Sequence, residues 1–235
     1  MFDPIFSKWI WGVAFLPGVV LALYGRWRFG RAYRRFSTVA SHGNLSGARA
    51  ARVLLDRVGM ANVELYETSE FLSDHYDPRR RCVFLSEKVA DNATVASVAI
   101  AAHVVAHGSQ FRQDHRFFRL RMVMMRFTGL FTNTSLLLIL AGWLELVDSP
   151  QNLLIAGAGL YTVFILLQLF TLPVEYEASR VAQKELTRHQ LIDASEEKAF
   201  DNMLGAAVWI DMPHLLAAPF GLGRLFSRKE KSDDE

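Results

Sequence analysis

The sequence predicts a mainly α membrane protein of the α+β class, with three transmembrane helices and a cytoplasmic domain that contains a small β-hairpin. Two long apolar runs joined by a short polar link predict two of these helices, and an apolar run near the N-terminus predicts the third. Two strand-like stretches between them predict the hairpin. At 235 residues, the chain can form one ordinary domain, or a smaller domain together with membrane segments.

Composition excludes several classes of protein. Hydrophobic residues make up 51% of the chain, so their distribution is more informative than their total. A formal net charge of +2 is too small to indicate nucleic-acid binding, and we expect no nucleic-acid partner. The single cysteine, Cys82, excludes an internal disulfide framework and fits a reducing compartment.

Residues 128–172 are predicted to form a transmembrane hairpin. Residues 153–172 carry no charge over 20 positions, the length that crosses the hydrocarbon core of a bilayer. Residues 128–147 carry only Glu145, and residues 148–152 form a short polar turn between the two runs. The alternative is a pair of buried core helices in a soluble domain, which fits two adjacent runs of this length less well.

Residues 1–24 are predicted to be an N-terminal transmembrane anchor. Its apolar run, residues 9–24, is interrupted by Pro17 and Gly18. A cleaved signal peptide has its positive charge before the apolar stretch, whereas here the arginines follow it. We therefore expect residues 25 onward to be cytoplasmic. Three basic clusters predict this orientation: Arg26, Arg28, Arg31, Arg34 and Arg35; Arg112, Arg116, Arg119, Arg121 and Arg126; and Arg180, Lys184 and Arg188.

Residues 25–127 are expected to form the cytoplasmic segment. Ser46 can cap a helix that ends at Gly59. Residues 63–66 and 81–85 read as two strands, and residues 77–80 have the chemistry of a turn between them. A second helix is predicted from about residues 92–94 to Gly108.

The C-terminal part, residues 173–226, is expected to begin with a cytoplasmic helix and to include a membrane-associated apolar segment. Residues 203–222 are largely apolar but contain Asp211, Pro213 and His214. We prefer an interfacial or re-entrant helix to a fourth span, because a span would place the following basic residues outside. Residues 227–235 are predicted to be a charged, disordered tail.

A pair of histidines on the second predicted helix is the main chemical signal. His103 and His107 are four residues apart, so one helical face presents both imidazoles and they can bind one metal ion. In a zinc peptidase, a glutamate general base follows the first histidine, and this chain has Val104 there. Taken alone, such a pair is more often structural than metal-binding.

A zinc site with two histidines needs a third protein ligand. Glu175 is the candidate, because Pro173 can begin a helix that leaves the membrane near the cytoplasmic surface. The alternative is that Glu175 and Glu177 form a solvated helix start that the helix dipole favours. Composition alone favours that alternative.

Several motifs in the right order resemble the bacterial membrane-bound neutral zinc metallopeptidase family, often called YugP-type. The resemblance implies a membrane-integrated gluzincin with a zincin-like cytoplasmic domain, a Zn²⁺ cofactor, and His103, His107 and Glu175 as metal ligands. The motifs are Leu72-Ser73-Asp74-His75-Tyr76-Asp77-Pro78, Leu85-Ser86-Glu87, Ala101-Ala102-His103 with His107, and Thr171-Leu172-Pro173-Val174-Glu175-Tyr176 with Ala178-Ser179.

The chain departs from the family pattern at the general base. The family has His-Glu-x-x-His, usually with glycine before the second histidine, whereas this chain has Val104 and Ala106. Candidates for a substitute base are Asp74, His75 and Glu177. Asp74 and His75 can also line the substrate groove or support the metal ligands; the alternative is that they only build a turn.

These features predict a catalytically deficient pseudopeptidase of the bacterial cytoplasmic membrane, multi-pass, with the histidine pair on the cytoplasmic side. Its expected partners are the lipid bilayer and a protein segment or a partner membrane peptidase. One alternative is an active membrane-embedded zinc endopeptidase that uses a non-standard general base. Another is a structural membrane protein whose histidines bind no metal.

Overall fold

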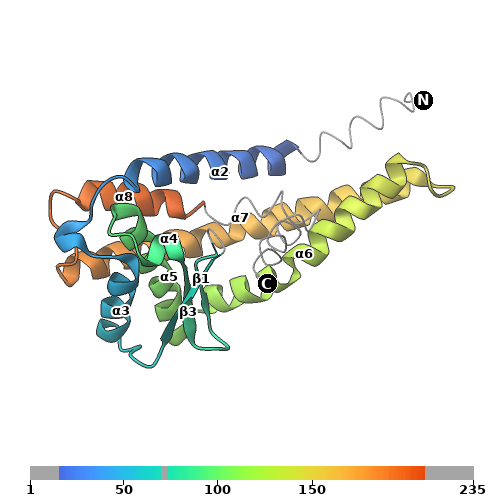
Figure 1. Ribbon diagram of the computed structural model, residues 1–235. Helices are drawn as coiled ribbons and strands as arrows, with labels where there is room; N and C mark the ends of the chain where they lie inside the picture. The colour runs from blue at the N-terminus through green and yellow to red at the C-terminus, as the bar shows by residue number, and fades with distance from the viewer. Residues whose placement is uncertain (1–15, 70–72, 210–235) are drawn as a thin grey trace, which may run out of the picture. The chain divides into compact units, whose positions relative to one another are not determined.

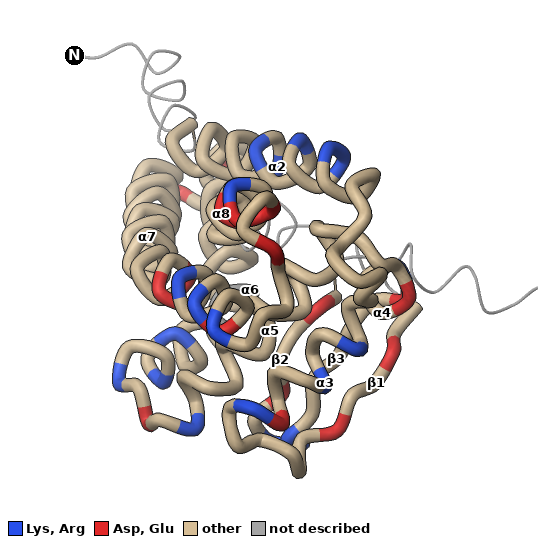
Figure 2. The backbone as a smooth tube through the Cα atoms, turned by 90° about the vertical axis from the view of Figure 1, so that its left-hand side faces the viewer, with Lys and Arg blue, Asp and Glu red and all other residues tan. Residues whose placement is uncertain are grey.

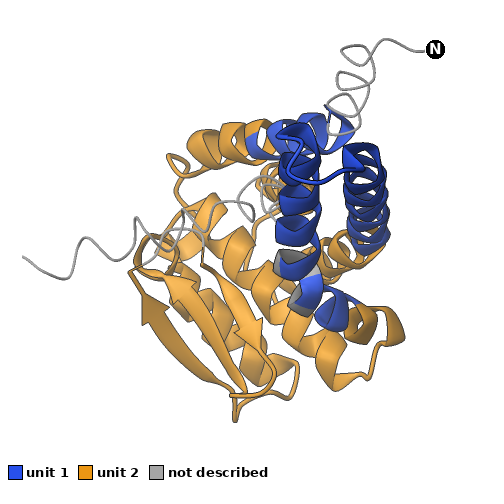
Figure 3. Cartoon of the chain, turned by 90° about the vertical axis from the view of Figure 1, so that its right-hand side faces the viewer, with its two compact units in different colours: residues 1–26, 121–171, 211–235 blue, residues 27–120, 172–210 orange. Residues whose placement is uncertain are grey.

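The computed structural model describes residues 16–69 and 73–209, which are mostly helical with one small sheet (Figure 1). The chain divides into two compact units (Figure 3). Unit 1 comprises residues 1–26, 121–171 and 211–235, and unit 2 comprises residues 27–120 and 172–210. The predicted N-terminal run to residue 15, the apolar segment from residue 210 and the C-terminal tail lie outside the described residues.

Unit 1 is built mainly from two helices: α6 (Arg116–Trp143) from Arg121 onward, and α7 (Pro150–Arg188) as far as Thr171. A Cβ placed at Gly157 would lie 2.9 Å from the Ser135 carbonyl oxygen, so the missing side chain lets the two backbones approach closely. The predicted hairpin is therefore present, although its turn is residues 144–149. The turn falls there because Pro150 sits at a helix start, where its missing N–H is harmless.

The outer surface of unit 1 is apolar. Large hydrophobic side chains on α6 and α7 are more than half exposed, among them Leu130, Leu137, Leu166 and Phe170. Among the described helices, α7 is the one with a stretch long and apolar enough to cross a membrane, and α6 has a shorter apolar stretch, Leu130–Trp143. One predicted span therefore has the required length, and the other two stay predictions.

Pro173 lies inside α7 and does not start a new helix as expected. A proline within a helix removes one backbone hydrogen bond. Burial of Thr171 before it and of Val174 after it provides packing on both sides that keeps the helix continuous.

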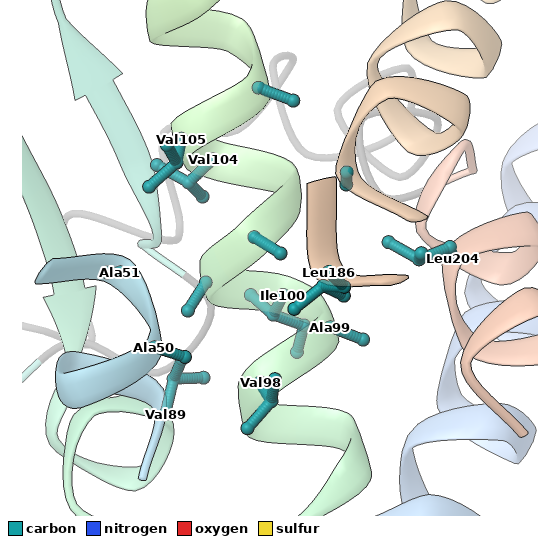
Figure 4. Packing of buried hydrophobic residues seen from close by; sticks show 14 of the residues in the cluster. Ala50, Ala51, Val89, Val98, Ala99, Ile100, Val104, Val105, Leu186 and Leu204 are labelled. Atoms are coloured by element: carbon teal, nitrogen blue, oxygen red, sulfur yellow. The ribbon is translucent and has the colours of Figure 1, made fainter. Parts of the chain in front are cut away.

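Unit 2 is organised around α5 (Val95–Arg112), which is buried along nearly its whole length. The segment is apolar on every side, as a central helix of a domain must be. Figure 4 shows α5 between Ala50 and Ala51 on one side and Leu186 and Leu204 on the other. Thr94 caps the helix, because its hydroxyl accepts a hydrogen bond from the Ser97 N–H at 3.2 Å.

The other helices of unit 2 include α3 (Gly47–Arg57), α4 (Glu87–Ala90) and α8 (Glu197–Ala207). The prediction for α3 is confirmed: Ser46 is its N-cap, and Gly59 just beyond its end has φ +73°. Helix α2 (Leu16–Phe36) enters unit 2 at Trp27, and a single helical turn, η1 (His42–Asn44), follows it. Residues 203–207, which begin the ambiguous apolar segment, belong to α8, and Met203, Leu204 and Ala206 pack in the core.

The sheet has three strands in the order β1–β3–β2: β1 (Glu64–Thr68), β2 (His75–Asp77) and β3 (Cys82–Ser86). The predicted pairing was wrong, because β1 runs parallel to β3, and the hairpin consists of β2 and β3. The predicted turn at residues 77–80 joins β2 directly to β3. β2 is therefore the strand that pairs with β3 in the hairpin. The Asp77 carboxylate builds this turn by accepting from the Arg79 N–H at 2.8 Å.

Candidate metal centre

Helix α5 presents both histidines on one face. Their Nε2 atoms lie 3.2 Å apart, and their rings are nearly perpendicular at 84°. Both side chains are buried among apolar residues, and the Phe118 ring lies 5.6 Å from the His107 ring. The one-turn spacing therefore makes one site on a rigid helix, shielded from bulk water on one side by an aromatic ring.

Helix α7 brings in the third residue, Glu175. The buried face of α7 repeats every three or four residues, through Val174, Ala178, Ala182 and Leu186, and Glu175 falls on that face. Its side chain is 0% exposed. A buried carboxylate is strongly unfavourable unless charge or hydrogen bonds compensate it, so its position indicates a compensating partner.

The three donor atoms converge. Glu175 Oε2 lies 3.1 Å from His103 Nε2 and 3.2 Å from His107 Nε2. Ligand atoms bound tetrahedrally to zinc at about 2.0–2.1 Å lie about 3.3 Å from one another. The observed triangle therefore has nearly the size that one zinc ion requires. Among the described residues, this is the group of three whose ligand atoms lie close enough together to hold a metal ion.

Ser179 fixes the orientation and tautomer of His103. Its hydroxyl donates to the Leu204 carbonyl at 2.9 Å, so its oxygen accepts the hydrogen bond from His103 Nδ1 at 3.1 Å. With the proton on Nδ1, the Nε2 lone pair of His103 points toward Glu175 and His107. Such outer hydrogen bonds orient a metal-binding imidazole and raise its basicity.

Gln110 does the same for His107. Its amide nitrogen donates to the Val174 carbonyl at 3.3 Å, which leaves its oxygen to accept from His107 Nδ1 at 3.1 Å. Two imidazole lone pairs and a carboxylate oxygen therefore face one point. Three acceptors repel one another unless a cation or a proton lies between them, so this donor set fits a divalent metal, and two imidazoles with one carboxylate suit zinc.

Val104 occupies the position of the expected general base. It is 3% exposed and lies one turn before Gly108 on the same face of α5. A Cβ at Gly108 would lie 3.3 Å from Tyr76 Cδ2, so this face is directed toward β2, an edge strand of the sheet. The side chain there is an aliphatic group that can neither accept nor donate a proton.

The other predicted site residues have separate roles. Asp74 accepts hydrogen bonds from the Ser86 N–H at 2.8 Å and from the Ser86 hydroxyl, which ties the loop to the end of β3. Burial raises the pKa of the Asp74 carboxyl, and the Ser86 hydrogen bonds oppose that rise. His75 is exposed and stacks on Phe84 with ring centroids 4.9 Å apart. The geometry thus agrees with the turn-building alternative for both residues.

Glu177 is separated from the three converging atoms. Its side chain is 47% exposed and pairs with His115 Nε2 at 3.1 Å. The supporting roles of Gln110 and Ser179 were not predicted. Their spacing could have indicated them: Gln110 is three residues after His107 and Ser179 is four after Glu175, so each lies on a helical face that carries a candidate ligand.

Two histidines on a buried helix and a buried glutamate from a second helix form a candidate metal site of the kind that zinc peptidases have, beside a small sheet. The chain belongs to the family described as "Putative neutral zinc metallopeptidase", whose model matches residues 11–227. It is 29% identical over 204 residues to the "Putative membrane protease YugP" of Bacillus subtilis (strain 168), covering 87% of this chain and 89% of that protein. No solved structure gives a significant match.

Proposed function

We propose that this protein is a multi-pass membrane pseudopeptidase of the zinc metallopeptidase family. It holds Zn²⁺ through His103, His107 and Glu175 and binds a protein segment or a partner membrane peptidase without cleaving it. The observation that carries the proposal is the contrast between a complete, hydrogen-bonded ligand set and the valine at position 104.

Bound zinc would supply a Lewis acid that polarises a peptide carbonyl and lowers the pKa of a coordinated water. Peptide hydrolysis also needs a group that takes a proton from the attacking water and delivers one to the leaving amine. General acid–base catalysis of this kind contributes about 10²–10⁴-fold, and Val104 supplies none of it.

The candidates for a replacement base are occupied elsewhere. Asp74 is bound to Ser86, His75 stacks on Phe84 and Glu177 pairs with His115. The groups hydrogen-bonded to the ligand histidines, Ser179 and Gln110, are neutral. These contacts support loss of hydrolysis.

The same surroundings support binding of an extended chain. β2 is an edge strand that pairs with β3 on one side only, and its Tyr76 side chain reaches the face of α5 that carries Val104 and Gly108. An extended peptide can add to such an edge through backbone hydrogen bonds. In the proposed function, a segment of a partner protein lies along β2 in a gluzincin-like groove and stays intact.

The proposed location is the bacterial cytoplasmic membrane, with unit 2 in the cytoplasm. The apolar stretch of α7 and the exposed hydrophobic side chains of unit 1 support membrane insertion. The arginine clusters that flank the apolar runs support the cytoplasmic orientation.

The second candidate function is an active zinc endopeptidase with a non-standard base. Retention of the ligand set together with Ser179 and Gln110 favours it, because a protein that needs only its groove has no chemical requirement for well-oriented ligands.

Two measurements on the purified full-length protein test these functions. Zinc content should approach one ion per chain and fall strongly in His103→Ala; equal content in both proteins would remove the metal from the proposal. Casein and membrane-protein substrates should remain uncleaved. Cleavage by the wild type that Glu175→Ala abolishes would establish the endopeptidase instead.

A further inference from the structure

A pocket lies in unit 2 between the C-terminal half of α2 and α8. Its volume is about 260 Å³, large enough for a small polar headgroup. Figure 2 shows the basic residues of α2 along the part of the helix beside α8. The pocket is lined by Trp27, Arg28, Arg31, Ala32, Arg35, Phe36 and Asn202.

The pocket is strongly cationic. Arg28, Arg31 and Arg35 follow an i, i+3, i+7 spacing, so one face of α2 carries all three guanidinium groups. No carboxylate is among the lining residues, and within residues 16–69 and 73–209 none of these arginines forms an ion pair. Three like charges on one helical face repel one another, and an anion between them would relieve that repulsion.

Aromatic rings help to position two of these groups. The Arg31 guanidinium lies 5.5 Å from the Trp27 ring centre, and that of Arg35 lies 5.4 Å from the Phe36 ring centre. A guanidinium held against an aromatic ring keeps its N–H groups available at its edge. Those donors match the oxygens of a phosphate group, which arginine binds in a bidentate manner.

The place of the pocket along the chain indicates the source of the phosphate. It begins at Trp27, directly after the apolar run of residues 9–24. Tryptophan and arginine just beyond a membrane-spanning run lie at the level of the lipid headgroups. We propose that this pocket binds the phosphate of an anionic membrane phospholipid, an interaction separate from the metal centre. An acidic peptide is less suitable, because the site adjoins the predicted membrane surface.

The test uses the full-length protein in a neutral detergent, with bound lipid counted by native mass spectrometry. Short-chain phosphatidylglycerol is titrated against phosphatidylcholine of the same chain length. The pocket variant is Arg31→Gln with Arg35→Gln. Its matched control is Arg26→Gln with Arg34→Gln, which removes the same charge from exposed positions of the same helix outside the pocket. Equal zinc content and helical circular dichroism show that both variants are folded.

We expect phosphatidylglycerol to bind at least tenfold more tightly than phosphatidylcholine. Each basic group near anionic lipid contributes about fivefold, so the pocket variant should bind about 25-fold more weakly. The control should change by less than threefold. If phosphatidylglycerol binding weakens equally in both variants, the proposal is overturned, because the lipid is then attracted by the overall positive charge of α2 and not by the pocket. Displacement of the lipid by equimolar inorganic phosphate, or by hexaglutamate, would overturn the lipid as the ligand.

Discussion

His103 Nδ1 lies 3.1 Å from the Ser179 hydroxyl, which itself donates to the Leu204 carbonyl. One serine on α7 therefore connects a candidate metal ligand on α5 with the backbone of α8. The hydrogen bond sets the tautomer of His103, and the packing of α8 holds the serine. The metal geometry thus depends on three helices.

Replacing Ser179 with alanine should weaken zinc binding about 10–100-fold, the usual effect of removing a hydrogen bond that orients a metal-binding histidine. The measurement is zinc affinity by competition with a chelator. Ser109→Ala is the matched control, because Ser109 is a buried serine whose hydroxyl accepts from Gln113 rather than from a ligand. An equal loss in the two variants would mean that Ser179 acts only through stability.

Restoring a carboxylate at position 104 should create or increase peptidase activity. Val104→Glu adds the missing proton acceptor beside the ligands, and we expect at least a 100-fold increase in cleavage of casein over the wild type. Val104→Gln is the control. Glutamine has nearly the same shape as glutamate but cannot accept the proton, so this variant should stay inactive.

If Val104→Glu binds zinc and remains inactive, the groove itself has lost its peptidase geometry. Activity of Val104→Gln equal to that of Val104→Glu would show that side-chain basicity at this position is irrelevant.

Two glutamates on α7 provide a matched pair for the third ligand. Glu175→Gln removes the charge from the buried atom that faces both histidines and should lower zinc affinity by at least tenfold. Glu177→Gln changes a half-exposed group paired with His115 and should leave zinc affinity within twofold. Isothermal titration of metal-free protein measures both, and the reverse order would reassign the ligand.

Asp74→Asn should change how stability depends on pH. Burial raises the pKa of Asp74, so the folded protein holds this proton more tightly than the unfolded chain does. The wild type therefore loses stability as the pH rises from about 3.9, the unfolded pKa, through the higher folded pKa. Asparagine keeps an acceptor for Ser86 without ionising, so the stability of the variant relative to wild type should increase over that range.

Thermal unfolding of metal-free wild type and Asp74→Asn across pH 4–7 measures this difference, since other titrations are common to both proteins. Zinc affinity at neutral pH should be unchanged in Asp74→Asn. Parallel stability curves would contradict the assigned pKa direction, and loss of zinc would give Asp74 a role at the metal.

Much of the fold could be predicted because its signals are local. Ser46 and Gly59 bracket α3, and Thr94 begins α5, since a cap and a stop depend on neighbouring residues alone. The strand pairing could not be predicted in the same way. β3 lies between β1 and β2 and pairs with both, which depends on the path of the chain between the strands, and the three-residue strand β2 leaves almost no periodic pattern.

The sequence by itself determined the spacing of His103 and His107, the valine between them and the apolar runs on either side of the site. Tertiary structure decided that Glu175, 72 residues from His103, shares their buried point while Glu177 lies half exposed. It also placed Ser179 and Gln110 behind the histidines. The reason is physical: helical periodicity fixes which residues share a face, but only packing of α7 against α5 brings distant donor atoms within coordination distance of one ion.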